Sequence, residues 1–358
     1  MQIKRDYSFD NAKLILIILV VFAHFLEFAK GYGSNTDIYR IIYSFHMPAM
    51  VFISGFFAKF TKRRIINIFV LYLLFQTLYI FFYNQIFSYE TKYQYTTPTW
   101  LLWYLLAYLF YLFLVPIIDL KKYNTKSSYI IASIVVLISF SLYFLMPFDS
   151  TQGYYLSISR FISFLPYFIL GFYINKFISN NNFKIEKISI KLIIKLSFLV
   201  LTILSVLIII FNKNITANML YGSYAYKSLK YNPFIKLILL FCGLSWIGFL
   251  LYTIRFNKKI PVVTRIGENT LSIFILHGFI LKWFQSAKYF SNTKINIFLI
   301  LLISIGIVYA LGNVLMGYFS KYILNGKIID VIVMKIKNKP QKEAEEITDD
   351  NIKEENIN

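Results

Sequence analysis

The sequence predicts an all-α protein, a polytopic membrane bundle of about ten transmembrane helices. Its residues are 58% hydrophobic and only 15% charged, whereas soluble domains have about 25% charged residues. The apolar residues also form long runs, and most of these runs have a length close to the ~20 residues that span a bilayer core. Because a helix satisfies its own backbone hydrogen bonds within lipid, each run is interpreted as one helix.

The ten runs follow one another with short polar segments between them. In chain order they cover about residues 14–29, 38–59, 65–87, 99–118, 128–146, 159–178, 190–211, 234–254, 267–287 and 296–320. The first run is short, and we expect it to extend through Lys13 or Lys30 by snorkelling. We therefore expect one membrane domain over residues 1–325. Residues 326–358 would form a basic and then acidic cytoplasmic tail that is disordered at its end.

The net charge of +20 raises the question of a nucleic-acid partner. Lysine and arginine are not gathered on a polar domain but lie in the short segments between apolar runs. This distribution is typical of positive-inside topology and of contact with anionic lipids, so we expect membrane lipids and no nucleic acid as partners. With the N-terminus inside, most basic residues fall on the cytoplasmic side. The predicted location is the cell membrane, with several passes and both termini cytoplasmic.

Cysteine usage excludes two classes of site. Cys242 is the single cysteine and lies inside an apolar run. No disulfide framework and no cysteine-based metal site can be built from one thiol. We expect no metal in the functional site.

Histidine placement is the strongest chemical signal. All three histidines fall inside predicted helices. His24 lies near the middle of the bilayer, and Lys13 and Glu27 share its helical face. Lipid does not tolerate such a stripe, so it faces the bundle interior or a wet cavity. Because imidazole accepts protons near neutral pH and a carboxylate can orient it, we predict His24 as general base and Glu27 as its partner. The alternatives are a histidine that only bridges helices and a carboxylate at the outer interface.

The other two histidines carry weaker signals. His46 precedes Pro48 in the outer half of the second helix, and we predict that it binds substrate. His277 lies in the middle of the ninth helix, where function and simple packing are equally favoured. The small pair Ser54-Gly55 predicts a close approach of two helices.

A basic turn follows the second helix. Lys62, Arg63 and Arg64 are consecutive, and such a cluster can hold the phosphates of a soluble donor. Positive-inside anchoring alone would also explain it. The predicted outer segments 88–98, 147–158 and 212–233, the last with Tyr221, Tyr224 and Tyr226, are rich in groups that contact sugars. An interfacial aromatic belt is the alternative explanation.

Several short elements follow one another in a fixed order along the chain. They are Arg5 and Asp10, the spacing Lys13-x10-His24, FHMP at 45–48, SGF at 54–56, WLLWY at 100–104, LPYFILG at 165–171 and IGENTLS at 266–272. Taken together, these residues resemble the acyltransferase-3 family of membrane acyltransferases, especially its fucose 4-O-acetylase-like branch, over about residues 5–320. Lys13 stands where the family more often has arginine.

The resemblance implies a ten-helix bundle that moves an acyl group, usually acetyl, from cytoplasmic acyl-CoA to a carbohydrate hydroxyl. The acceptor would be a cell-envelope glycan or exopolysaccharide, free or lipid-linked, made together with polysaccharide synthesis machinery. Acetyl-CoA would be a donor substrate and not a permanently bound cofactor. His24 matches the catalytic histidine, and Lys62, Arg63 and Arg64 match the donor-binding turn. Lys13 and His46 would contact substrate, and Trp103 and Tyr104 would line the sugar path or simply pack.

Two other functions remain open from the sequence. A transporter or flippase for a lipid-linked glycan or small solute also uses intramembrane histidines and carboxylates. A non-catalytic scaffold in an envelope synthesis complex is the third hypothesis. Only the acyltransferase requires His24 for acetyl transfer.

Overall fold

The prediction of an all-α fold is confirmed. The structure is a computed structural model that describes residues 7–313 with gaps at 30, 33–35, 88–91, 121–125, 146–153, 182–187, 224–232, 253–258, 289 and 291–294, and also Tyr318. The described residues form helices and no strand. Arg5, Lys30, Tyr224, Tyr226 and the predicted tail 326–358 lie outside the described residues.

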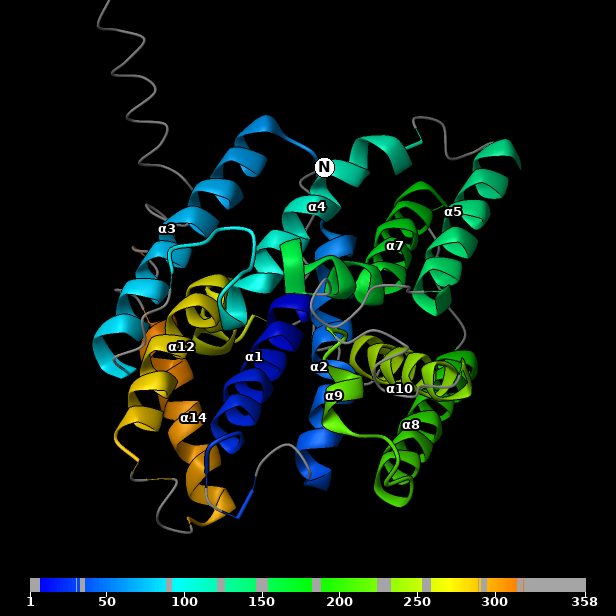
Figure 1. Ribbon diagram of the computed structural model, residues 1–358. Coiled ribbons are helices and arrows are strands. Elements are labelled where there is room, and N and C mark those ends of the chain that lie inside the picture. The colour runs from blue at the N-terminus through cyan, green and yellow to red at the C-terminus, as the bar shows by residue number, and fades with distance from the viewer. Residues whose placement is uncertain are drawn as a thin grey trace, which may run out of the picture.

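A helix occupies each of the ten predicted ranges (Figure 1). The principal helices are α1 (Ser8–Leu26), α2 (Asp37–Phe56), α3 (Lys62–Phe87), α4 (Trp103–Ile118), α5 (Lys126–Leu145), α7 (Ile158–Asn181), α8 (Ile188–Phe211), α10 (Pro233–Tyr252), α12 (Thr270–Ser286) and α14 (Ile297–Gly312). Short helical elements precede or connect them: η1 (Trp100–Leu102), η2 (Tyr155–Ser157), α9 (Ala217–Leu220) and α11 (Pro261–Glu268).

The helices have the length and apolarity of membrane spans. Within the described ranges, seven segments are long and apolar enough to cross a bilayer. The helices α12 and α14 are shorter, with 17 and 16 residues, and α2 carries Asp37, Arg40 and His46. On the outlying α5 and α8, large apolar side chains such as Leu137 and Ile193 are exposed, as expected where lipid is the solvent. The protein is therefore a multi-pass membrane bundle; that all ten helices cross, with both termini cytoplasmic, stays a prediction.

Helix boundaries differ from the prediction at two places. Helix α1 begins at Ser8, about two turns before the expected start, so Lys13 lies within it and pairs with Asp10 at 2.8 Å. The polar residues of this first part are buried by protein and therefore escape a search for apolar runs. The predicted helix 267–287 is divided at Asn269, whose ψ of 17° departs from helical values. Residues 267 and 268 of that range are the end of α11, which begins at Pro261.

Helix α1 lies at the centre of the bundle. It packs against α2, α10, α11, α12 and α14, and Figure 1 shows it between α12 and α14 on one side and α2 on the other. Leu16, Ile17 and Val20 are fully buried. Of the predicted stripe on this helix, His24 is buried among the neighbouring helices, whereas Lys13 is partly exposed and Glu27, at the end of the helix, is exposed.

Glycines bring α2 and α7 into close contact. A Cβ atom on Gly55 would lie 2.1 Å from the carbonyl oxygen of Phe168, and one on Gly171 would lie 2.1 Å from that of Phe52. The close approach predicted from Ser54-Gly55 is thus confirmed, and the LPYFILG segment supplies its partner. This contact fixes α2 closely against α7.

Candidate active site

The predicted catalytic pair forms a direct contact. His24 lies in the last turn of α1, nearer the end of the helix than the predicted position near mid-bilayer, because the helix begins earlier and ends earlier than predicted. It is 9% exposed, and Glu27 follows the helix as its cap. Nδ1 of His24 lies 2.9 Å from Oε1 of Glu27. The i, i+3 spacing read from the sequence therefore brings the two groups together.

Two tyrosines of α2 complete the contacts of this carboxylate. The Tyr43 hydroxyl donates to Oε1 of Glu27 at 2.6 Å, and the Tyr39 hydroxyl donates to the same atom at 3.0 Å. The Tyr39 oxygen also lies 2.9 Å from the hydroxyl of Tyr221. Sequence analysis missed these tyrosines, although Tyr39, Tyr43 and His46 stand at i, i+4 and i+7 and so share one helical face.

This arrangement fixes the tautomer of His24. An ionised carboxylate only accepts hydrogen bonds, so Nδ1 of His24 carries the proton and donates it to Glu27. The oxygen of Tyr43, 3.0 Å from Nδ1, can accept from the same N–H because its own proton points to Glu27. Nε2 of His24 therefore carries the lone pair that can accept a proton.

The other two histidines lie beside this pair. Nδ1 of His46 donates to the carbonyl of Ile42 and Nδ1 of His277 to that of Ile273, both at 2.8 Å. The rings of His24 and His277 stack with centroids 5.7 Å apart. Nε2 of His277 is buried without a hydrogen-bond partner among the described residues. All three predicted histidines thus meet in one region, and His46 faces a cavity while His277 packs behind His24.

A cavity of about 300 Å³ lies against His24 and Glu27. We call it the outer cavity, after the side on which the predicted topology would place it. Its wall is mainly aromatic and includes His46, Trp100, Trp103, Arg160 and Tyr221. The Arg160 guanidinium lies 4.9 Å from the centre of the Trp103 ring. Trp103, which was predicted to line the sugar path, lies in the wall of this cavity. Trp100 and Arg160 also lie in the wall, and the sequence analysis did not predict them as site residues. No spacing in the sequence links Arg160 to His24, because only tertiary packing brings α7 to this cavity.

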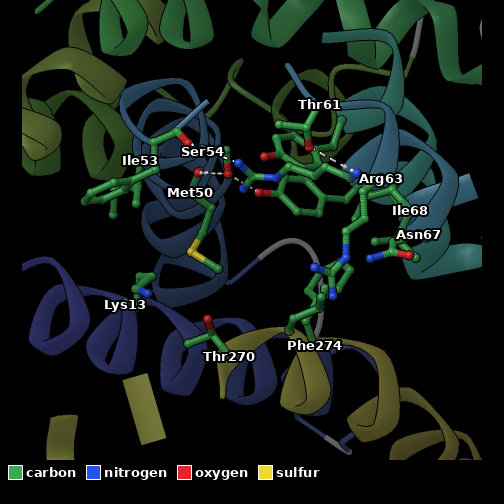
Figure 2. A pocket seen from close by; sticks show the side chains of 16 residues that line it. Lys13, Met50, Ile53, Ser54, Thr61, Arg63, Asn67, Ile68, Thr270 and Phe274 are labelled. Atoms are coloured by element: carbon green, nitrogen blue, oxygen red, sulfur yellow. Dashed lines mark hydrogen bonds between the residues drawn. The ribbon is translucent and has the colours of Figure 1, made fainter. Parts of the chain in front are cut away.

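A second, basic cavity of about 450 Å³ lies at the Lys13 end of the face of α1 that carries Lys13, His24 and Glu27. Lys13, Arg63 and Arg64 line it together with Tyr104 and Tyr108. Figure 2 shows Lys13 from α1 and Thr270 from α12 on one side, with Arg63 and Asn67 from α3 across from them. Lys62 begins α3 but is not part of the wall.

The two cavities separate the predicted site residues into two groups. Lys13 and His24 share a face of α1, but eleven residues separate them by about 16 Å along the helix. Lys13 consequently lines the basic cavity rather than the outer one. Tyr104 also faces the basic cavity, although it directly follows Trp103 in the outer wall. The site therefore has a basic compartment, an aromatic compartment, and a proton acceptor at the second.

Comparison with known proteins identifies the family. The Acyl_transf_3 family, described as an acyltransferase domain, matches residues 6–315. The chain belongs to the acyltransferase-3 family. It is a membrane acyltransferase, and the family membership favours acyl transfer over the transporter and scaffold hypotheses. Membership of the fucose 4-O-acetylase-like branch stays a prediction.

Sequence similarity to individual known proteins covers only short segments of the chain. Nodulation protein NolL of Mesorhizobium japonicum is 41% identical over 59 residues, 15% of this chain and 16% of that protein. Nodulation protein NolL of Sinorhizobium fredii is 44% identical over 66 residues, 17% of this chain and 18% of that protein. The matched part thus spans less than a fifth of each relative. No solved structure matches the acyltransferase significantly.

Proposed function

We propose that this membrane acyltransferase moves an acetyl group from cytoplasmic acetyl-CoA to a hydroxyl of a cell-envelope or exopolysaccharide carbohydrate. The observation that carries the proposal is the hydrogen bond from Nδ1 of His24 to Glu27, which leaves Nε2 as a proton acceptor beside an aromatic cavity. The protein would act in the cell membrane, beside the machinery that makes or exports its glycan acceptor.

The basic cavity suits the phosphates of the donor. Arg63 and Arg64 present guanidinium groups, which bind phosphate oxygens through paired N–H donors. The Arg64 side chain is anchored by a 3.2 Å bond from Nη1 to the carbonyl of Phe57 and lies 5.5 Å from the centre of the Tyr108 ring. Lys13 adds a third cation from α1. The thioester end of the donor would then extend from this cavity toward His24.

The outer cavity, with its mainly aromatic wall, suits the carbohydrate. Trp100 and Trp103 offer flat apolar faces, and His46 and Tyr221 offer polar atoms around them. A sugar ring combines both kinds of surface, so stacking and hydrogen bonding can orient one of its hydroxyls. The hydroxyl that lies against Nε2 of His24 would be the one that is acylated.

The chemistry is a direct transfer. Nε2 of His24 takes the proton of the acceptor hydroxyl as its oxygen attacks the thioester carbonyl carbon. The C–O ester bond forms and the C–S bond breaks, and the imidazolium returns the proton to the leaving thiolate to give free CoA. Glu27 stabilises the positive charge that the imidazole carries between the two steps.

A membrane assay tests the proposal. Membranes that contain the acyltransferase are incubated with acetyl-labelled acetyl-CoA and glycans extracted from a strain that lacks the gene. Label is expected in alkali-labile esters on the glycan, and the glycans of the deletion strain are expected to have lost O-acetyl groups. Absence of label together with unchanged O-acetylation in the deletion strain would overturn the proposal. Succinyl-CoA in parallel identifies the acyl group.

A further inference from the structure

One aromatic side chain forms a wall of both cavities. Phe274 lines the basic cavity and also the outer one, and it is the residue that the two share within the described part of the chain. It is 3% exposed. Thr270, one turn earlier on α12, lines only the basic cavity, and Phe274 extends that wall inward toward His277. Figure 2 shows Phe274 and Thr270 as neighbouring side chains of α12 at this pocket.

The neighbouring helices place the boundary at the same level. On α2, Met47 lines the outer cavity and Met50 the basic one. On the segment formed by η1 and α4, Leu101 lines the outer cavity and Leu105 the basic one. In each pair, the residue that lines the outer cavity and the residue that lines the basic cavity are about one helical turn apart, about 5 Å along the axis. The partition between the cavities is therefore about one side chain thick.

Phe274 packs across this boundary against a tethered partner. Its ring lies 5.2 Å from that of Tyr104, centre to centre. The Tyr104 hydroxyl bonds to Oγ of Ser54, which in turn donates to the carbonyl of Met50 at 2.9 Å. Tyr104 is thus held to α2 by a chain of hydrogen bonds, whereas the Phe274 ring has no polar atom. Rotation of the Phe274 ring would therefore break no hydrogen bond.

We propose that Phe274 is a gate between the basic cavity and His24, and that this gate selects the carbohydrate hydroxyl over water as acceptor. This inference rests on the proposed function. The acyl-thioester end of the donor must pass Phe274 to reach Nε2 of His24. While the donor is bound, the ring closes against the arm that has passed it and keeps water in the basic cavity away from the histidine and the thioester. Exclusion of water from a closed site is a general means of preventing hydrolysis of a reactive substrate.

The side reaction that the gate prevents has a defined stoichiometry. With water in place of the hydroxyl, Nε2 of His24 takes a proton from water, whose oxygen attacks the thioester carbon. The C–S bond breaks, and the imidazolium passes its proton to the leaving thiolate. The products are free CoA and acetic acid, which ionises to acetate. The ratio of glycan acetylation to acetate release therefore measures the gate directly.

Two substitutions of Phe274 test the proposal in purified protein in nanodiscs. Phe274→Ala opens the partition, and the ratio of transfer to hydrolysis is expected to fall by about tenfold or more. Phe274→Trp enlarges the gate and is expected to lower transfer by about tenfold while acetyl-CoA still binds. Phe274→Leu, a smaller change, keeps the test open if the alanine variant does not fold. Its ratio should lie between those of the wild type and the alanine variant.

A matched control lies on the same helix. Phe279 stacks on Tyr79 with centroids 4.0 Å apart and lines neither cavity. Phe279→Ala should keep the wild-type ratio. If wild-type protein acetylates glycan but the alanine, leucine and tryptophan variants keep its ratio and rate, the gate is refuted alone. If wild-type protein neither binds acetyl-CoA nor labels glycan, the proposed function fails and the gate with it.

Discussion

Nδ1 of His24 lies 2.9 Å from Oε1 of Glu27, one helical turn further along the chain. This contact turns an isolated membrane histidine into an oriented base, because the carboxylate holds the proton on Nδ1 and leaves Nε2 to accept another. The carboxylate is itself held by two tyrosine hydroxyls from α2. The geometry of the base thus depends on the packing of α1 against α2.

Removal of the Glu27 charge should reduce catalysis without affecting donor binding. Glu27→Gln keeps the size of the side chain but no longer stabilises the imidazolium. We expect acetyl transfer to fall by about 10²- to 10⁴-fold, while acetyl-CoA affinity stays near wild type because the donor cations lie in the other cavity. Single-turnover rates and equilibrium binding measure the two effects. A fall in affinity with an unchanged rate would contradict the role assigned to Glu27.

The two tyrosines on Glu27 should differ in importance. Tyr43→Phe removes the 2.6 Å bond to Oε1, and Tyr39→Phe removes the 3.0 Å bond. Hydrogen bonds to charged groups contribute about 1.5–3 kcal/mol, so the first change should lower the transfer rate by about tenfold and the second by less. Tyr72→Phe is the control, since its 2.6 Å bond joins α3 to the Tyr95 carbonyl and Tyr72 lines neither cavity. Equal losses in all three variants would point to stability rather than to the site.

The basic turn should separate into binding and non-binding residues. Arg63 and Arg64 line the basic cavity and Lys62 does not. We expect Arg63→Ala and Arg64→Ala each to raise the KM for acetyl-CoA by about tenfold with little change in kcat. Lys62→Ala carries the same loss of charge and should leave KM nearly unchanged. Equal KM values for all three variants would indicate a purely topological role.

Much of the fold follows from hydropathy, since lipid permits few alternatives to the helix. The ten apolar ranges coincide with helices because each must satisfy its backbone internally. The beginning of α1 was missed because Ser8, Asp10 and Asn11 are polar yet buried by other helices. Hydropathy cannot separate such a segment from a loop. The break at Asn269 was missed for a related reason, since no proline interrupts the run there.

The candidate site was predicted in part, along single helices. His24 and Glu27 meet because spacing on one helix fixes their separation. Arg160 and Phe274 could not be assigned, because their places depend on how α7 packs against α2 and how α12 packs against α1. Tyr221 was singled out only as one of three tyrosines in a predicted outer segment. Lys13 and Tyr104 were predicted to contact substrate, and the structure places both at the basic cavity. Their contact with substrate stays a prediction.

The contact between α2 and α7 should be sensitive to a single methyl group. Gly55→Ala would place Cβ 2.1 Å from the Phe168 carbonyl oxygen, and such overpacking costs about 1–3 kcal/mol. We expect a lower Tm in detergent. Gly306→Ala is the control, because a Cβ atom there meets nothing within 4 Å; it should be neutral or slightly stabilising, since alanine favours the helix. Equal Tm values for the two variants would contradict the close contact.

The most direct test of the central claim is glycan acetylation by a His24→Ala variant. Purified wild-type and variant protein in nanodiscs are compared for acetyl-CoA binding and for transfer of labelled acetyl to the glycan of the deletion strain. With His24 as the base, the variant should fold and bind acetyl-CoA as the wild type does but transfer less than about 1% as much label. A folded His24→Ala variant that acetylates the glycan at the wild-type rate would contradict the account.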